Sequence, residues 1–179
     1  MRLKIFAIGL AKQKCGMRFY FQSAVSLSRE TVFAFFENPA RLELLHAGWS
    51  RIRLLRHGGR VEVGAETWVE VTIARIVPVV LGFRHTVFEP PIRFAEQTIH
   101  GPFSRFSHIH EFEAVDGKTI VRDLLEICLS RHYGGETAMR RILAPQITRI
   151  FEHRADALNR LVADGTVNRC IALKCCGKG

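Results

Sequence analysis

The sequence predicts an α+β fold in which a curved antiparallel sheet of about six to seven strands wraps around a long C-terminal helix. Three observations support this prediction. Short β-type segments separated by Gly and Pro follow one another from residue 51 to residue 128. Apolar residues then recur at helical spacing as far as about Ala163. A strand and two short helices are expected before the sheet segments. With 179 residues, the chain has the length of one domain.

The first expected strand covers residues 18–27, which are rich in aromatic and β-branched side chains. Ser28 offers a side-chain cap for the first short helix, because its hydroxyl can accept a hydrogen bond from a free backbone N–H. Asn38 and Pro39 end that helix. A second short helix is expected over residues 41–46.

Six further strands are expected to form the sheet. Pro78 separates the second of them from the third, and Asp116-Gly117 between the last two is the signature of a tight type I′ hairpin. Short connections of this kind favour antiparallel neighbours. The six expected strands are Arg51–His57, Glu66–Ile76, Val80–Phe88, Ile92–His100, Ser104–Ala114 and Lys118–Cys128.

The last element is a helix that follows Gly134-Gly135 and ends near Ala163. Pro145 must start a new helix within this stretch or kink it, because proline lacks the N–H that a helix interior uses. At about 1.5 Å per residue the helix is long enough to cover one face of the sheet. A curved sheet that holds a single helix leaves space between them, so we expect an internal cavity.

The formal charge of +9 comes mainly from the two ends of the chain. Residues 1–17 and 165–179 hold seven basic residues and no acidic one, so that residues 18–164 have a net charge of only +2. We therefore expect a domain at residues 18–164, an N-terminal extension at 1–17, and a disordered basic tail with three cysteines at 165–179. A nearly neutral domain argues against nucleic acid as the main partner.

The first residues only loosely resemble a signal peptide, because their apolar stretch of seven residues, Ile5 to Ala11, is short and no convincing cleavage site follows. No apolar run reaches the roughly 20 residues of a membrane-spanning helix. The sequence therefore predicts a cytoplasmic protein without a transmembrane segment.

The expected hairpin turn fixes which residues of its two strands face each other. If Asp116-Gly117 is the loop, Glu111 lies across from Arg122 on a solvated face. The opposite face is mostly apolar and must point inward. It places Phe106, His108, His110 and Phe112 opposite Ile127, Leu125, Asp123 and Val121, respectively.

His108, His110 and Asp123 are the unusual members of this inward face. His110 lies directly opposite Asp123, at the Cβ distance of about 4.5–5.5 Å that permits a hydrogen bond. Three interpretations remain open: a buried pair that fixes the hairpin register, a polar anchor for a ligand in the cavity, or an acid–base pair. Two histidines and a carboxylate also suggest a metal. However, Asp123 faces only one histidine, and no other Glu or His has a spacing that completes the set. No metal and no cofactor are therefore expected.

Several motifs of the chain resemble one subfamily of the SRPBCC superfamily, which includes START-like domains and polyketide cyclases. The resemblance covers about residues 18–162, from Ser28 at the first short helix to Ile150-Phe151 and Arg154 on the last helix. Its most specific part follows the family pattern GPF…W-x-H-x-H-x-F…D-G-x-T…D. The matching residues are Pro90, Pro91, Phe94, Gln97, Gly101, Pro102, Phe103, Phe106, His108, His110, Phe112, Asp116, Gly117, Thr119 and Asp123.

The resemblance implies a helix-grip fold with a hydrophobic ligand cavity between the sheet and the C-terminal helix. Two departures from the family pattern, Phe106 for its usual Trp and Ile127 for its usual Tyr, remove two polar groups and predict a drier pocket. Both changes weaken a catalytic interpretation.

The function predicted from the sequence is the binding of a hydrophobic or amphipathic small molecule. One alternative is a cyclase- or dehydratase-type enzyme that uses His110 and Asp123 as an acid–base pair. Another is a module that binds lipid or nucleic acid through its basic ends. The oligomeric state stays open. The candidate ligand-binding residues are Phe106, His108, His110, Phe112, Asp123 and Leu125.

Overall fold

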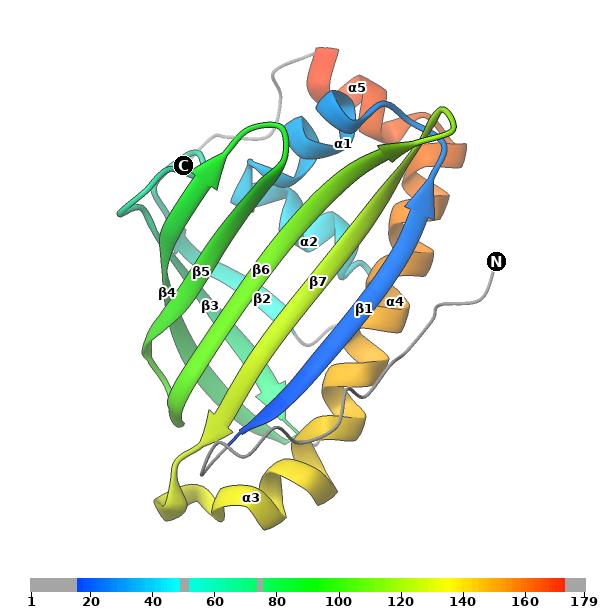
Figure 1. Cartoon of the computed structure of the whole chain (residues 1–179). Coiled ribbons are helices and arrows are strands. Elements are labelled where there is room, and N and C mark those ends of the chain that lie inside the picture. Colours follow the sequence, from blue (N-terminus) through cyan, green and yellow to red (C-terminus); the bar gives the residue numbers. More distant parts are fainter. Residues whose placement is uncertain (1–15, 49–51, 74–75, 173–179) are drawn as a thin grey trace.

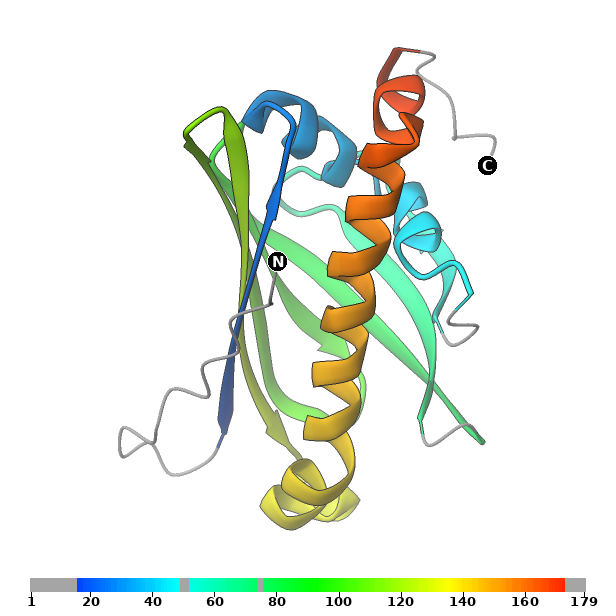
Figure 2. The same ribbon diagram turned by 90° about the vertical axis from the view of Figure 1, so that its right-hand side faces the viewer.

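The computed structural model describes residues 16–48, 52–73 and 76–172, and it contains a seven-stranded antiparallel sheet that curves around one long helix (Figures 1 and 2). The strand order is β1-β7-β6-β5-β4-β3-β2. The first strand therefore pairs with the last one. The strands are β1 (Met17–Val25), β2 (Ile52–His57), β3 (Glu66–Ile73), β4 (Val77–Glu89), β5 (Arg93–His100), β6 (Phe103–Val115) and β7 (Lys118–Leu129).

The long helix α4 (Ala144–Ala163) crosses the concave face of the sheet, as Figure 2 shows. Pro145 stands in its first turn, where a missing N–H costs nothing, and a π-helical turn at Met139–Leu143 precedes it. The remaining helices are α1 (Arg29–Phe36), α2 (Leu42–Leu45), α3 (Gly135–Ala138) and α5 (Thr166–Ala172), with 3₁₀ turns at Pro39–Arg41 and Arg131–Tyr133. This arrangement is the α+β helix-grip fold that the sequence predicts.

Local sequence signals explain where the first helices begin. The Ser28 side chain accepts a hydrogen bond from the Thr31 N–H at the start of α1. Asn38 caps the 3₁₀ turn in the same way by accepting from the Ala40 N–H. These caps satisfy backbone donors that helix starts leave free.

The β6–β7 hairpin has the predicted register. Asp116 and Gly117 have φ angles of 48° and 72°, which a type I′ turn requires at both central positions. His110 therefore lies opposite Asp123, and Glu111 lies opposite Arg122. The hairpin turn thus decides which side chains of two long strands enter the interior.

The core lies between the concave face and the helices. In the first half of α4, Phe151 stacks on Phe21 of β1 with ring centroids 4.4 Å apart. At the C-terminal end of α4, α1 contributes the buried Phe33 and Phe35. The two parts of the core hold the helix at both ends and leave room in between.

Two segments differ from the sequence-based expectation. Pro78 does not separate two strands but lies within β4, where it pairs with Thr72 of β3. β5 pairs with β4 only from Gly82 onward, so the second side of β4 is open at Pro78 and needs no N–H from it.

The second difference is at the C-terminus. Residues 166–172, which we assigned to a disordered tail, form α5 beside α1 (Figure 1). Val167 is only 1% exposed, and the buried Arg41 donates a hydrogen bond of 2.9 Å to the Cys170 carbonyl oxygen. The apolar side chains Val167 and Ile171 explain why this segment packs. Residues 173–179 and 1–15 lie outside the described part of the chain.

No helix among the described residues is both long and apolar enough to cross a membrane.

Candidate functional site

A cavity of about 210 Å³ lies between the sheet and the helices. Its walls are mostly apolar and come from strands at the centre of the sheet, from α2 and from α4. Val69, Leu81 and Phe83 line one side, and Ile147 and Ile150 of α4 line the other. The cavity is far larger than the 10–15 Å³ that a single water needs.

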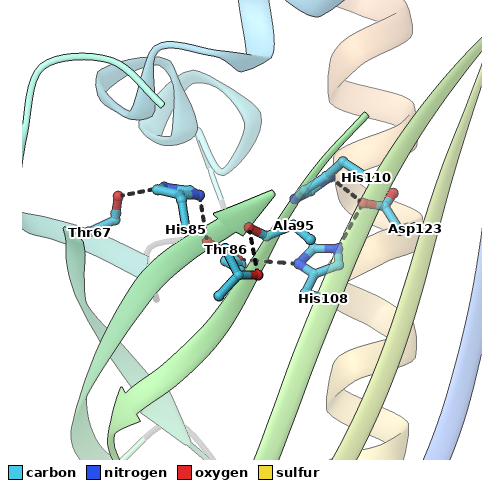
Figure 3. Close-up of polar contacts among 8 residues, drawn as sticks. Thr67, His85, Thr86, Ala95, His108, His110 and Asp123 are labelled. Atoms are coloured by element: carbon cyan, nitrogen blue, oxygen red, sulfur yellow. Dashed lines mark hydrogen bonds and ion pairs between the residues drawn. The ribbon is translucent and has the colours of Figure 1, made fainter. Parts of the chain in front are cut away.

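Polar side chains gather on the cavity wall that β4, β5 and β6 form. His85, Glu96 and His108 occupy directly opposed positions on these three neighbouring strands. His110 and Asp123 continue the group toward β7. Figure 3 shows His85 of β4, His108 and His110 of β6 and Asp123 of β7 in this group. Sheet pairing alone thus places five ionisable groups in one cluster.

Asp123 contacts both histidines of β6 through a single oxygen. His108 Nε2 lies 3.0 Å from Asp123 Oδ1 in hydrogen-bond geometry. His110 Nδ1 lies 2.8 Å from the same oxygen, but its angle excludes a hydrogen bond. The sequence predicted only the contact with His110. The diagonal contact forms because His108 shares the inward face and an imidazole spans the distance between next-nearest cross-strand positions.

Glu96 holds the other side of His108. His108 Nδ1 lies 3.3 Å from Glu96 Oε1, and His85 Nδ1 lies 3.9 Å from Glu96 Oε2. On its far side His85 Nε2 is 3.3 Å from the Thr67 hydroxyl. His108 therefore lies between two buried carboxylates.

This position raises the pKa of His108. Burial by itself lowers the pKa of His108, but hydrogen bonds and attraction from Asp123 and Glu96 outweigh burial and raise it. Burial raises the pKa of Glu96, and the facing histidines overcome this effect and lower it to about 2. The pKa of Asp123 is also lowered, by His110 and His108, against the effect of burial. The two carboxylates are thus ionised, and both favour the protonated form of His108.

The two outer histidines stay neutral. Burial and the neighbouring charge of His108 lower the pKa of His110 to about 4. Burial also lowers the pKa of His85, although Glu96 partly opposes it. Arg154 of α4 lines the same cavity and lies over the Phe151 ring, 4.8 Å from its centroid. Its positive charge offsets the excess negative charge of the cluster.

The structure places the six predicted ligand-binding residues in three settings. Phe106, His108, His110 and Leu125 line the cavity. Asp123 lies behind the two histidines and contacts them from the adjoining strand. Phe112 instead packs against Phe33 and Phe36 in the core, with ring centroids 5.3 Å apart in both cases.

The sequence analysis did not identify Glu96 or His85 as site residues. Glu96 follows the buried Phe94 by two positions, so strand alternation was the signal that placed it inside. Together they make this end of the pocket more polar than the substitutions Phe106 and Ile127 suggested. Glu96 also supplies the carboxylate that the metal argument lacked: ligand atoms of Glu96, His108 and His110 all lie within 4.8 Å of one another.

The comparison with solved structures shows that other proteins share this fold. Protein Ms6760 from Mycobacterium smegmatis matches with a TM-score of 0.66 and 12% identity, covering 92% of this chain and 98% of its own. TTHA0849 from Thermus thermophilus matches with a TM-score of 0.67 and 15% identity, covering 83% of this chain and 98% of its own. Major latex-like protein 151 from Panax ginseng matches with a TM-score of 0.63 and 8% identity, covering 83% of this chain and 98% of its own.

No family model and no curated protein matches the sequence. At these identities the solved structures establish the architecture alone. The chain therefore has a helix-grip fold that bacterial and plant proteins share, with an apolar cavity and a carboxylate–histidine cluster in its wall.

Proposed function

We propose that this protein binds a hydrophobic or amphipathic small molecule in the cavity between the sheet and α4. The observation that carries the proposal is the lining: a partly open, mostly apolar space with one polar wall. Small-molecule sites typically combine apolar walls with a few placed polar groups. The apolar part of the ligand would contact Leu81, Phe83 and Ile147. Its polar group would face Glu96 and the histidines.

Native mass spectrometry of protein purified from its own host tests the proposal directly. We expect a co-purified small molecule that stays bound under gentle ionisation and is released on denaturation. A second measurement uses 1-aminoanthracene, a neutral aromatic amine, as a fluorescent probe of the purified protein. We expect saturable binding with a rise in fluorescence, because the probe leaves water for an apolar site.

Two variants of the same helical segment locate the bound probe. Ile147→Trp enlarges a side chain that lines the cavity, so we expect it to weaken probe binding by about tenfold or more, equivalent to about 1.4 kcal/mol. Ile142→Trp makes the same change at a residue that is 49% exposed, and we expect unchanged binding. Equal effects of the two variants would contradict binding in the cavity.

One observation favours a second function, acid–base catalysis of the cyclase or dehydratase kind. His110 is neutral at pH 7 and lies beside the buried Asp123 carboxylate at the cavity wall, so it can accept a proton from a bound molecule. Turnover of an aromatic polyketide by the wild type that is lost in Asp123→Asn would establish this function in place of simple binding.

A further inference from the structure

We propose that Glu96, His108 and His110 bind a divalent first-row metal ion, and that Asp123 is the outer partner that positions the two histidines. Imidazole nitrogen and carboxylate oxygen form the ligand set that Zn²⁺ and Fe²⁺ sites use. The inference goes beyond small-molecule binding and does not depend on it, because the ligands come from the protein itself.

The separation of the ligand atoms fits a metal ion. For metal–ligand bonds of about 2.0–2.1 Å, two ligands of a tetrahedral site lie about 3.3–3.4 Å apart. His108 Nδ1 and Glu96 Oε1 are 3.3 Å apart. A ring nitrogen of His110 completes a group whose atoms all lie within 4.8 Å. Small side-chain rotations would bring the third ligand into place, since all three side chains project from paired strands.

The arrangement of Asp123 is the second observation. In metal sites a ligating histidine almost always gives its other ring nitrogen to a carboxylate, a backbone carbonyl or water. Asp123 Oδ1 meets Nε2 of His108 and Nδ1 of His110. Each histidine thus keeps its second nitrogen, Nδ1 of His108 and Nε2 of His110, for a metal ion. One carboxylate thus contacts both rings, through a hydrogen bond to His108 and an ion-pair contact with His110.

An unpartnered nitrogen beside the group is the third observation. His85 is 4% exposed, and its Nδ1 has no hydrogen-bond partner among the described residues although it lies 3.9 Å from Glu96 Oε2. A buried polar atom without a partner normally costs about 1–3 kcal/mol, so native proteins rarely keep one. A metal ion held by Glu96 would give this nitrogen a partner as a further ligand.

Charge favours the same occupant. Glu96 and Asp123 bring two carboxylates into a buried site, with side-chain exposures of 15% and 13%. A divalent cation that replaces the proton on His108 Nδ1 brings two positive charges beside these carboxylates for the one that it displaces. With Glu96, His108 and His110 as ligands, one position of a tetrahedral site is left for His85 Nδ1, for water or for a donor atom of a molecule in the cavity.

The test is a calorimetric titration of the full chain with Zn²⁺ after removal of bound metal. Its thiols are first alkylated, because the five cysteines of the sequence could also bind Zn²⁺. We expect saturable binding of one ion per chain. A parallel titration with Co²⁺ should produce visible absorption bands of a nitrogen- and oxygen-ligated ion, without thiolate charge transfer.

The variants separate ligands from bystanders. We expect Glu96→Gln and His110→Gln to weaken Zn²⁺ binding by more than about 100-fold, because loss of an outer partner alone costs about 10–100-fold. We expect Asp123→Asn to weaken Zn²⁺ binding less, by about 10–100-fold. His132→Gln, which changes an exposed histidine on the 3₁₀ turn at Arg131–Tyr133, is the matched control and should bind as the wild type does.

Measurements on the wild type alone test metal binding if a variant does not fold. In the wild type, Zn²⁺ should raise the thermal midpoint, because an ion that binds only the folded state stabilises it. The inference is wrong if alkylated wild-type protein shows no saturable binding, or if folded Glu96→Gln and His110→Gln both bind as the control does. Binding of 1-aminoanthracene is measured on metal-free protein. Failure of small-molecule binding and failure of metal binding can therefore be told apart.

Discussion

Asp123 combines two roles that are usually separate in a buried carboxylate. It accepts a hydrogen bond from His108, and it contacts His110 without one. The pKa of the first histidine is raised and that of the second is lowered, although both touch the same oxygen. The two differ because a second carboxylate, Glu96, lies 3.3 Å from His108 Nδ1, whereas burial and the positive charge of His108 lower the pKa of His110.

Replacing Asp123 by Asn tests its part in stability and binding. The amide keeps the shape and one acceptor but removes the charge that faces two histidines. We expect a loss of about 1–3 kcal/mol in the free energy of unfolding, measured by urea denaturation. If the cluster anchors the ligand, probe binding should also weaken about tenfold. Glu126→Gln, a charge change on the same strand with a half-exposed carboxylate, is the control and should change neither quantity appreciably.

His46 should make the protein less stable in mild acid. Burial, Arg154 and His153 lower its pKa in the folded state to about 3, and its ordinary value is 6.5. Between these values the unfolded chain binds a proton that the folded chain does not. Stability from His46 is therefore full above pH 6.5 and decreases as the pH falls toward 3, by about 2 kcal/mol at pH 5.

Urea denaturation of the wild type and of His46→Gln between pH 7.5 and pH 5 isolates this contribution. We expect the wild type to lose about 2 kcal/mol more than the variant over that range. Because other groups titrate as well, only the difference between the two proteins is informative. Parallel curves for wild type and variant would contradict the assignment. His132→Gln, which changes an exposed histidine, should follow the wild type.

The sequence predicted the part of the site that one turn controls. Asp116-Gly117 has a known geometry, so the pairing of His110 with Asp123 follows from counting along two strands. Glu96 depends instead on the β5–β6 register, where Glu96 pairs with His108. The pairs of β5 and β6 are centred on Pro102, so their connection is not a two-residue turn like Asp116-Gly117. No rule for two-residue turns could fix that register in advance.

Among the elements, those with local signals were the predictable ones. Ser28 and Asn38 mark their helix starts through side-chain caps, and Pro145 marks the start of α4. α5 was not predicted, although Asp164 accepts a hydrogen bond from the Thr166 N–H at its start, because its seven residues are stabilised by contacts with α1, far away in the sequence. The basic charge of the segment suggested a solvated end. Burial of Val167 outweighed that charge.

The burial of Val167 gives α5 a measurable share of the stability. Val167→Ala removes apolar surface from a side chain that is 1% exposed, and we expect a loss of about 1.5–3 kcal/mol. Asn168→Ala changes the exposed neighbour on the same helix and should stay within about 0.5 kcal/mol of the wild type. Equal stability of the two variants in urea denaturation would show that α5 does not pack on α1.

At the scale of the whole molecule, the distribution of charge separates two classes of partner. The domain between residues 18 and 164 has a net charge of only +2. Binding of neutral 1-aminoanthracene in the cavity should therefore change less than about twofold between about 50 and 200 mM salt, measured by fluorescence titration. A protein that neutralises several phosphates of its partner loses affinity for that partner by a factor of about 10³–10⁵ over this range. A steep salt dependence of a natural partner would favour the alternative that uses the basic ends.

The pairing of β1 with β7 also sets an order of events during synthesis. Phe21 lies opposite Asp123, so β1 leaves the ribosome about 100 residues before its neighbour β7 exists. α4, which covers the concave face, is made later still. Until then the future cavity wall is open to water, and long-range pairing of this kind is slow to form. The nascent chain thus presents its most apolar surface, with an unpaired strand edge, at the stage when chaperones are most needed.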